Sequence, residues 1–264
     1  MASRARSSSF MSERVAAAYS TSAKKKTLPI KTQMAVVNWE NVLVPMDWMV
    51  VHLGLEASAD AARQAALRCQ HTPYLQRSIA ALEERVMDLL AKTMESIKGP
   101  VVITSAYSTV FVEYVSSLFF PRLTAALRNA TTGIYVVGTP NTTLTIDELM
   151  DWKVNLMHTA IFEKLFAGAD VKEAQRLLNR PTSGKIGIVA LCATEIDVST
   201  TSAVLSIAPN AIVKRVKVND MKSATAKHLR GCPMSLEDFY TQLSTLTAFV
   251  QHAAASTNCI SISL

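Results

Sequence analysis

Short apolar segments alternate with amphipathic segments along most of the chain. The apolar segments are rich in Val and Ile and have the length of buried strands; they span residues 34–39, 100–104, 133–138, 185–191 and 212–218. Between them, apolar residues recur at helical spacing. Strands that alternate with helices predict a parallel sheet joined by right-handed crossovers. The pattern therefore predicts an α/β fold.

The longest connection follows the first strand and predicts a helical insertion over about residues 56–98. An Ala-rich stretch at 57–68 predicts a short helix. Thr72 followed by Pro73 is typical of a helix start, and the apolar residues after it keep helical spacing until Gly99 and Pro100. We expect this pair of helices to return the chain to the sheet of a Rossmann-like domain.

Two further helices are predicted near the end of the sheet-forming region. Thr145 and Glu148 have the spacing of a capping box, which predicts a helix that continues to Phe166. Another helix is predicted over about 235–252. The apolar stripe of the first of these two helices is expected to belong to the core.

The last predicted strand is basic. Valines alternate with basic residues over 213–218, which predicts an edge strand whose Lys214 and Lys217 face solvent and discourage pairing with other chains. Residues 253–264 are rich in Ala and Ser and are expected to form a C-terminal tail. The globular α/β domain should therefore span residues 34–252.

The positive charge of the chain is confined to its start. The net charge is +6, and the first 31 residues hold seven basic residues and one acid, so the rest of the chain is neutral. Residues 1–33 are therefore expected to form a basic, extended arm. The Ser- and Arg-rich segment 1–22 has the composition of an organellar transit peptide or of a disordered arm. The lysines at 24–26 suit an acidic surface such as RNA, anionic lipid or an acidic protein.

The four cysteines give no sign of a metal site or a disulfide framework, because Cys69, Cys192, Cys232 and Cys259 are scattered without the spacing of ligands. Reduced thiols in an intracellular compartment are the simplest explanation. The apolar segments are shorter than the roughly 18 residues that span a bilayer, so no membrane segment is expected.

The strand end and loop at 36–45 read Val-Val-Asn-Trp-Glu-Asn-Val-Leu-Val-Pro. This block resembles the opening motif of haloacid dehalogenase (HAD) superfamily phosphatases, above all a protist-type subgroup with the motif Asp-Trp-Asp-Asp-Thr-Leu-Leu-Pro. In that family the first Asp is the nucleophile and the second, two residues later, is the general acid and base. Asn38 and Glu40 stand at these positions.

Later segments extend the resemblance. Thr104 ends the second strand where the family places a phosphate-binding hydroxyl. Lys153 matches the lysine of the third motif, with Lys185 as a competitor. The fourth motif of the family supplies acids that bind magnesium, and Cys192 stands at one of their positions. By the resemblance, the helical insertion occupies the place of a small cap, although it can equally be an ordinary crossover.

The acids that follow Cys192 have two interpretations. Glu195 and Asp197 come three and five residues later, and a shifted loop would bring them to a metal. We instead expect them in the first turn of the next helix, where acids favour the positive end of the helix dipole.

The altered motif positions predict a domain without catalysis. A neutral amide at Asn38 can neither form an aspartyl-phosphate nor supply an anionic oxygen to magnesium. The degenerate positions are Asn38, Glu40, Thr104, Lys153 and Cys192. We therefore expect a HAD-like pseudoenzyme with no catalytic residues, no cofactor and no metal.

The expected function is that of a structural or scaffold subunit in a larger assembly, cytoskeletal or ribonucleoprotein. Its partners would be other proteins, reached through residues 1–33 and an acidic surface, with RNA as a further candidate for the arm and no membrane. The expected location is the cytoplasm, with a cytoskeletal association, and the mitochondrion is the alternative. The alternative function is a divergent phosphatase or phosphate-binding sensor that uses Glu40, Thr104 and Lys153.

Overall fold

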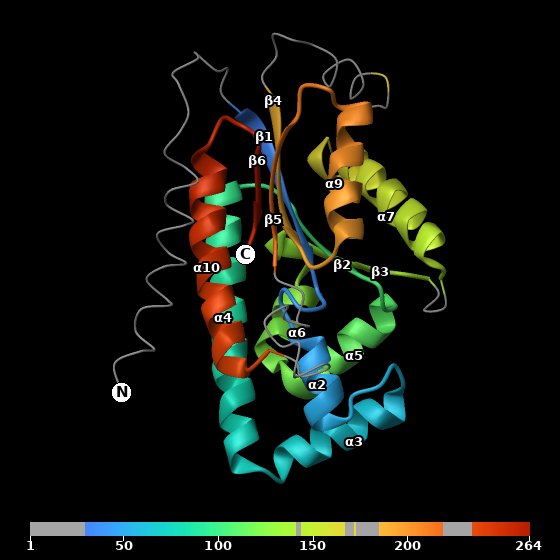
Figure 1. The fold of residues 1–264 in the computed structure, drawn as a ribbon, viewed down its shortest axis with the longest axis vertical. Coiled ribbons are helices and arrows are strands. Elements are labelled where there is room, and N and C mark those ends of the chain that lie inside the picture. Colours follow the sequence, from blue (N-terminus) through green and yellow to red (C-terminus); the bar gives the residue numbers. More distant parts are fainter. Residues whose placement is uncertain (1–29, 141–143, 167–171, 173–184, 219–233) are drawn as a thin grey trace, which may run out of the picture.

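The computed structural model describes residues 30–140, 144–166, 172, 185–218 and 234–264 (Figure 1). Its strands are β1 (Ile30–Asn38), β2 (Val101–Ser105), β3 (Ile134–Gly138), β4 (Lys185–Cys192), β5 (Ile212–Lys217) and β6 (Ile260–Ser263). Its α-helices are α2 (Met46–Leu53), α3 (Ala59–Gln70), α4 (Pro73–Ile97), α5 (Thr109–Phe119), α6 (Pro121–Arg128), α7 (Ile146–Ala160), α9 (Glu195–Ile207) and α10 (Leu236–Ala255). The short helices η1 (Ala130–Thr132) and η2 (Ile161–Leu165) precede β3 and extend α7.

The strands form one parallel sheet in the order β3-β2-β1-β4-β5-β6. This is the strand order of doubly wound Rossmann folds, in which the chain changes direction across the sheet between β1 and β4. The predicted α/β fold with a Rossmann-like parallel sheet is confirmed. In such sheets the crevice for ligands opens at the carboxyl ends of the strands on either side of this switch point.

Helices cover both faces of the sheet (Figure 1). On one face, here called the α4/α10 face, α4 and α10 pack together, with α5 and α6 nearby. On the other, the α7/α9 face, α7 and α9 pack together. The alternation of side chains along β1 serves both layers, because Ala35 and Val37 join the first core while Met34 and Val36 join the second.

The predicted helical insertion over about 56–98 is present and contains the two expected helices, and a third helix, α2, precedes it in the same connection between β1 and β2. The long helix α4 begins at Pro73 and ends at Ile97, as its start signal and spacing predicted. The short helix α3 spans Ala59–Gln70, whereas α2 lies in a segment for which no helix was predicted. The predicted capping box is also confirmed, since Thr145 and Glu148 make both of its hydrogen bonds at the start of α7.

One crossover has the opposite hand to the other four. The connections from β4 to β5 and from β5 to β6 step in the same direction across the sheet. The helix of the first, α9, lies on the α7/α9 face, whereas α10 lies on the α4/α10 face (Figure 1). The connection through α10 therefore departs from the expectation that all crossovers are right-handed, which holds for about 98% of parallel connections.

The two ends of the domain differ from their predictions. Residues 1–29 of the basic arm lie outside the described residues, and residues 30–33 belong to β1 rather than to the arm. The expected C-terminal tail contains the strand β6, which pairs with β5 through four residues from Lys214 to Lys217. The strand β5 is therefore an internal strand and not the predicted edge.

Lys214 is buried, contrary to the prediction that it faces solvent. Its exposed fraction is 0%, and it lies on the α4/α10 face together with Val216, which belongs to the core on that face. Among the described residues its Nζ has no hydrogen-bond partner. Burial lowers the pKa of Lys214 to about 8, because an ammonium group loses its hydration there, while the neighbouring Cys259 thiol acts in the opposite direction.

The described part of the chain contains no helix that is both long and apolar enough to cross a membrane. Cys69, Cys192 and Cys259 are free thiols there, and Cys232 lies outside the described residues.

The substitution Lys214→Met should increase the free energy of unfolding at pH 7, because it removes a buried ammonium. The lowered pKa corresponds to a cost of up to about 3 kcal/mol. Between pH 8 and 10.5 the unfolded chain holds this proton more tightly than the folded chain, so the stability of the wild type gains on that of the variant as the pH rises. Urea unfolding of both proteins across this range measures the difference, and a difference that does not change with pH would contradict the assignment.

Candidate functional site

The end of β1 and the loop after it place Asn38 and Glu40 at the switch point. Trp39 N donates to Thr104 O at 2.8 Å, which continues the pairing of β1 with β2. The backbone then turns back on itself, with Val44 N donating to Trp39 O and Asn41 in the left-handed region at φ 57°. Val42, Leu43 and Val44 are fully buried, so the apolar residues of the loop anchor it in the core.

Asn38 is the last residue of β1, and its side-chain amide uses both ends. Its Nδ2 donates to the backbone carbonyl of Glu40 at 2.8 Å, and its Oδ1 accepts from Lys153 Nζ at 3.4 Å. The side chain is buried. An aspartate here would place an anionic oxygen against a carbonyl oxygen that now receives a hydrogen bond, so the local geometry favours the amide.

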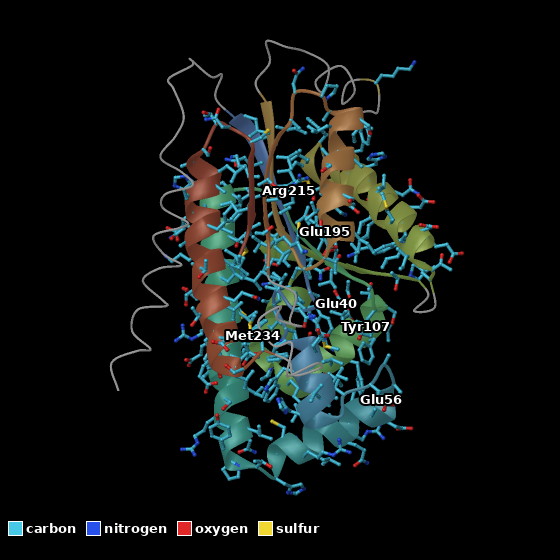
Figure 2. The ribbon with its side chains drawn as sticks, viewed as in Figure 1. Glu40, Glu56, Tyr107, Glu195, Arg215 and Met234 are labelled. Atoms are coloured by element: carbon cyan, nitrogen blue, oxygen red, sulfur yellow. The ribbon has the colours of Figure 1, made fainter. Side chains whose placement is uncertain are left out.

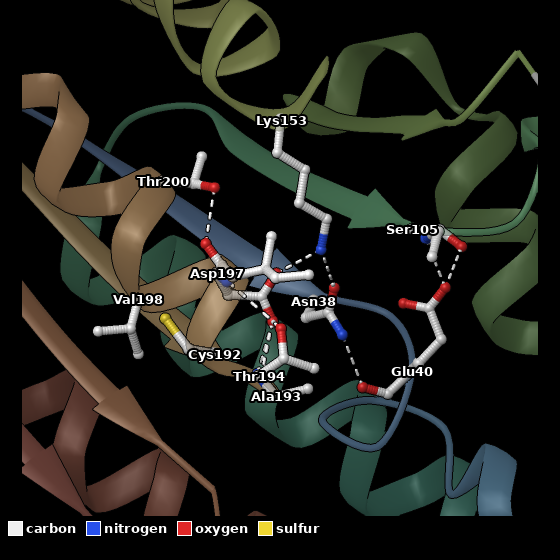
Figure 3. Close-up of polar contacts among 12 residues, drawn as sticks. Asn38, Glu40, Ser105, Lys153, Cys192, Ala193, Thr194, Asp197, Val198 and Thr200 are labelled. Carbon is white, nitrogen blue, oxygen red and sulfur yellow. Dashed lines mark hydrogen bonds and ion pairs between the residues drawn. The ribbon is translucent and has the colours of Figure 1, made fainter. Parts of the chain in front are cut away.

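Lys153 and Asp197 form a buried ion pair in the centre of the site (Figure 3). Lys153 comes from α7 and Asp197 from the first turn of α9, and their side chains are 6% and 8% exposed. The second carboxylate oxygen of Asp197 accepts from Ala193 N and Thr194 N at 2.9 Å and from Thr194 Oγ1 at 3.1 Å. Both charges are therefore neutralised inside the protein, with the acid also at a helix N-terminus.

Glu40 turns away from this pair toward the loop after β2 (Figure 3). Its Oε1 accepts from Ser105 Oγ at 2.6 Å, Ala106 N at 2.7 Å and Tyr107 N at 3.3 Å. Glu40 and Tyr107 lie close together at this end of the sheet (Figure 2). Three donors that converge on one oxygen form an anion-binding nest, and the carboxylate of Glu40 occupies it.

The other oxygen of Glu40 is buried and has no hydrogen-bond partner among the described residues. Burial raises the pKa of Glu40, and the hydrogen bond from Ser105 and the charge of Lys153 oppose this rise without cancelling it. The carboxyl group is thus held by the protein on one side and dehydrated on the other.

The space left in the site is small. A cavity of about 20 Å³ lies between the side chains of Asn38, Thr104, Lys153 and Cys192 and those on α9. This volume accommodates about one water molecule. A tetrahedral phosphate group, with four oxygens, requires these side chains to move.

Cys192 ends β4 beside the cavity and does not have the properties of a nucleophile. Burial, and then the charge of Asp197, raises the pKa of Cys192 to about 12. The thiol therefore stays protonated at neutral pH, and the thiolate is the reactive form. Its nearest polar contact is Thr201 Oγ1 at 3.9 Å.

The predicted site residues are brought together in part. Asn38, Thr104, Lys153 and Cys192 line the same cavity, although Thr104 contributes no side-chain hydrogen bond to Glu40 and its neighbour Ser105 does. Lys185, the alternative to Lys153, begins β4 and so lies at the opposite end of that strand from the site.

Sequence reasoning missed the partner of Lys153. Asp197 was expected in the first turn of a helix, where it is found, but its pairing with Lys153 was not foreseen. The spacing of Thr194 and Asp197 is that of a capping box and both of its hydrogen bonds are present, so it could have placed this carboxylate at the end of β4. Lys153 was predicted only as a match to a motif lysine, and the structure buries it on α7 together with Met157 and Ala160.

The residues present do not fit a divalent cation at the centre. The Lys153 ammonium lies between the side-chain oxygens of Asn38 and Asp197, where magnesium would need to reach the same oxygens. The like charges of the ammonium and the metal ion would repel each other strongly in a buried site. Within the described residues no group of three or more His, Cys, Asp or Glu side chains is arranged to hold a metal ion.

Removal of either partner of the buried pair should destabilise the fold. Lys153→Met and Asp197→Asn should each lower the free energy of unfolding by about 3–5 kcal/mol, because each leaves an uncompensated buried charge. The double variant should be more stable than the sum of the two losses predicts. Urea unfolding of the four proteins gives this coupling energy.

The exposed pair of Lys92 and Glu95 on α4 provides a matched control. The corresponding variants Lys92→Met and Glu95→Gln should leave the unfolding midpoint unchanged, because water screens exposed charges. If the losses in the free energy of unfolding at Lys153 and Asp197 simply add in the double variant, the two charges are not coupled, and this would contradict the prediction.

Comparisons of the chain with protein-family models, with curated proteins and with solved structures found no match. The fold and the contacts of the polar centre formed by Asn38, Glu40, Lys153 and Asp197 are the observations that bear on function.

Proposed function

We propose that this chain is a non-catalytic, HAD-like domain that acts as a structural subunit of a larger assembly. The observation that carries the proposal is the pairing of Lys153 with Asp197, because it consumes the charges that a phosphoryl-transfer site would direct at its ligands. The polar centre is then a structural feature that joins α7 and α9 to the end of β1.

The first supporting step concerns the missing nucleophile. Asn38 stands at the end of β1, at the motif position of the nucleophile, and its side chain accepts a hydrogen bond from Lys153. Its amide nitrogen is engaged by the carbonyl of Glu40 and its oxygen by the ammonium. An amide is a poor nucleophile, and both ends of this one make hydrogen bonds inside the protein.

The second supporting step concerns Glu40, the candidate for proton transfer. A general acid or base must reach the reacting group. One carboxyl oxygen of Glu40 accepts from the nest, and the other is buried, with no hydrogen-bond partner among the described residues. The third concerns space, since the cavity of about 20 Å³ is too small for a phosphate ester. Each step favours a closed polar core over an open active site.

The role in an assembly rests on the charge distribution of the sequence. The whole positive excess lies in the first 31 residues, of which 1–29 are outside the described part. A basic arm next to a neutral domain suits an acidic partner surface, on a protein or on RNA. The expected cytoplasmic location and the mitochondrial alternative stay predictions.

A phosphate-binding sensor is the second candidate, and one observation favours it. Ser105, Ala106 and Tyr107 offer three converging donors at the same end of the sheet as Lys153. An external oxyanion would have to displace Glu40 from these donors. The Glu40 carboxylate is part of the chain, so its effective concentration at these donors is high and a free anion competes with it poorly. The scaffold proposal therefore has the stronger support.

The purified protein should not hydrolyse a generic phosphate ester with magnesium present. Asn38→Asp should also be inactive. The Lys153 ammonium still lies between the side-chain oxygens of residue 38 and Asp197, and Glu40 still fills the nest. A colorimetric assay of released phosphate, with Glu40→Gln as the control for background, measures this. Turnover by the unmodified protein that Glu40→Gln abolishes would contradict the proposal and support a divergent phosphatase.

The tagged chain in a gentle lysate of its own cells should sediment with a large particle. Replacement of Lys24, Lys25 and Lys26 by Ala should shift it toward the ~29 kDa monomer, because the arm loses half of its excess charge. Replacement of Lys92, Lys98 and Lys172, which lie in the folded part, is the charge-matched control. Sedimentation of the unmodified chain as a free monomer would contradict the scaffold role.

A further inference from the structure

The side chains of Asn38 and Lys153 lie close enough in the polar centre to react with each other (Figure 3). Lys153 Nζ is 3.4 Å from Asn38 Oδ1. Because an amide C=O bond is about 1.2 Å long, Nζ is at most about 4.6 Å from Cγ, the carbon of the amide. The two residues are 115 positions apart in the chain. The fold therefore brings a nitrogen nucleophile and a carbonyl carbon together from distant segments.

Asp197 supplies the base that this amine needs. Its Oδ1 accepts directly from Lys153 Nζ, and both side chains are buried. A charged pair inside a protein lacks the hydration that stabilises it in water, which lowers the cost of moving a proton from the ammonium to the carboxylate. The neutral amine is the form that attacks a carbonyl carbon.

The amide of Asn38 is held in place, and a space adjoins it. Its Nδ2 donates to the backbone carbonyl of Glu40 at 2.8 Å, which fixes the orientation of the amide group. The cavity of about 20 Å³ is lined by both Asn38 and Lys153. This volume accommodates about one molecule of the size of water, and ammonia has that size. The site therefore has room for ammonia as a leaving group.

We propose that Asn38 and Lys153 join in an intramolecular isopeptide bond. Asp197 first takes one proton from the Lys153 ammonium. The neutral Nζ then attacks Asn38 Cγ, and an electron pair of the C=O bond moves to the oxygen. When the C=O bond forms again, the bond between Cγ and Nδ2 breaks. The departing Nδ2 group takes up one proton from Nζ and the proton held by Asp197, so it leaves as ammonium and the carboxylate is regenerated.

This cross-link suits a structural subunit. It connects β1 to α7 covalently and closes a long loop, which lowers the conformational entropy of the unfolded chain. Asp197 stays stabilised, because Ala193 N and Thr194 N still donate to its second oxygen. The ion pair is the state before the reaction. The inference rests on the closed polar centre of the proposed function, but it requires no partner molecule.

The folded full-length protein, kept at neutral pH, should lose the mass of one ammonia molecule in intact mass spectrometry. The same chain in concentrated urea should keep its full mass, because unfolding separates the two residues. After proteolysis, tandem mass spectrometry should find a branched peptide that joins the segments of Asn38 and Lys153. An asparagine that cyclises on its own backbone loses the same mass, so the branched peptide distinguishes the two reactions.

Three variants assign the roles of the side chains. Lys153→Arg keeps a cation opposite Asp197, so it should fold, and it should keep its full mass because a guanidinium stays protonated. Asp197→Asn should form the branched peptide about a hundredfold more slowly, because the base is missing. If circular dichroism shows that Asp197→Asn is unfolded, Lys153→Arg alone decides. Lys92→Met alters an exposed lysine and should react like the wild type.

The urea midpoint should rise as the cross-link accumulates in the wild type and stay constant in Lys153→Arg. A folded wild-type chain that keeps its full mass, or that loses ammonia without the branched peptide, would overturn the proposal. Such a chain could still sediment with a large particle, so failure of the cross-link is distinguishable from failure of the scaffold role.

Discussion

The buried pair of Lys153 and Asp197 is the contact on which the arrangement around the switch point depends. Lys153 comes from the helix that follows β3, and Asp197 from the helix that follows β4, so the pair connects two crossovers on the α7/α9 face. Through Asn38 it also reaches the end of β1. Desolvation of two charges is costly, and the hydrogen bonds from Ala193 and Thr194 to the same carboxylate offset part of that cost.

Two lysines that are buried in the described part of the chain show how far the surroundings determine the role of a charged side chain. Lys153 donates to the carboxylate of Asp197, which lies at a helix N-terminus, and to the amide oxygen of Asn38. Lys214, in contrast, has no hydrogen-bond partner within the described residues. The first therefore stabilises a particular geometry, and the second destabilises the packing of β5 under α10 at neutral pH.

The sequence was informative where local pattern determines structure. Buried parallel strands are apolar on both faces, which made β1 to β5 recognisable, and the capping box located the start of α7. The position of Lys214 was misjudged because alternation shows which residues share a face but not which face a later strand and helix will cover. β6 consists of only four residues at the end of an Ala- and Ser-rich segment, and its pairing with β5 is a long-range contact.

The candidate site was predictable in its members more than in its contacts. The end of each strand near the switch point supplied Asn38, Thr104 and Cys192, as expected for an open α/β sheet. The use of Asp197 as an internal partner of Lys153, and of Glu40 as the occupant of the nest, depends on side-chain geometry between distant segments. No local sequence pattern contains that information.

The most direct test of the account is a calorimetric titration of the wild-type protein with magnesium, with inorganic phosphate present. A centre already occupied by its own ammonium and carboxylate predicts only the heat of dilution up to about 10 mM of either ion. A saturable heat, together with a matching rise in the thermal unfolding midpoint, would show that the site opens to external ligands and would contradict the closed polar core.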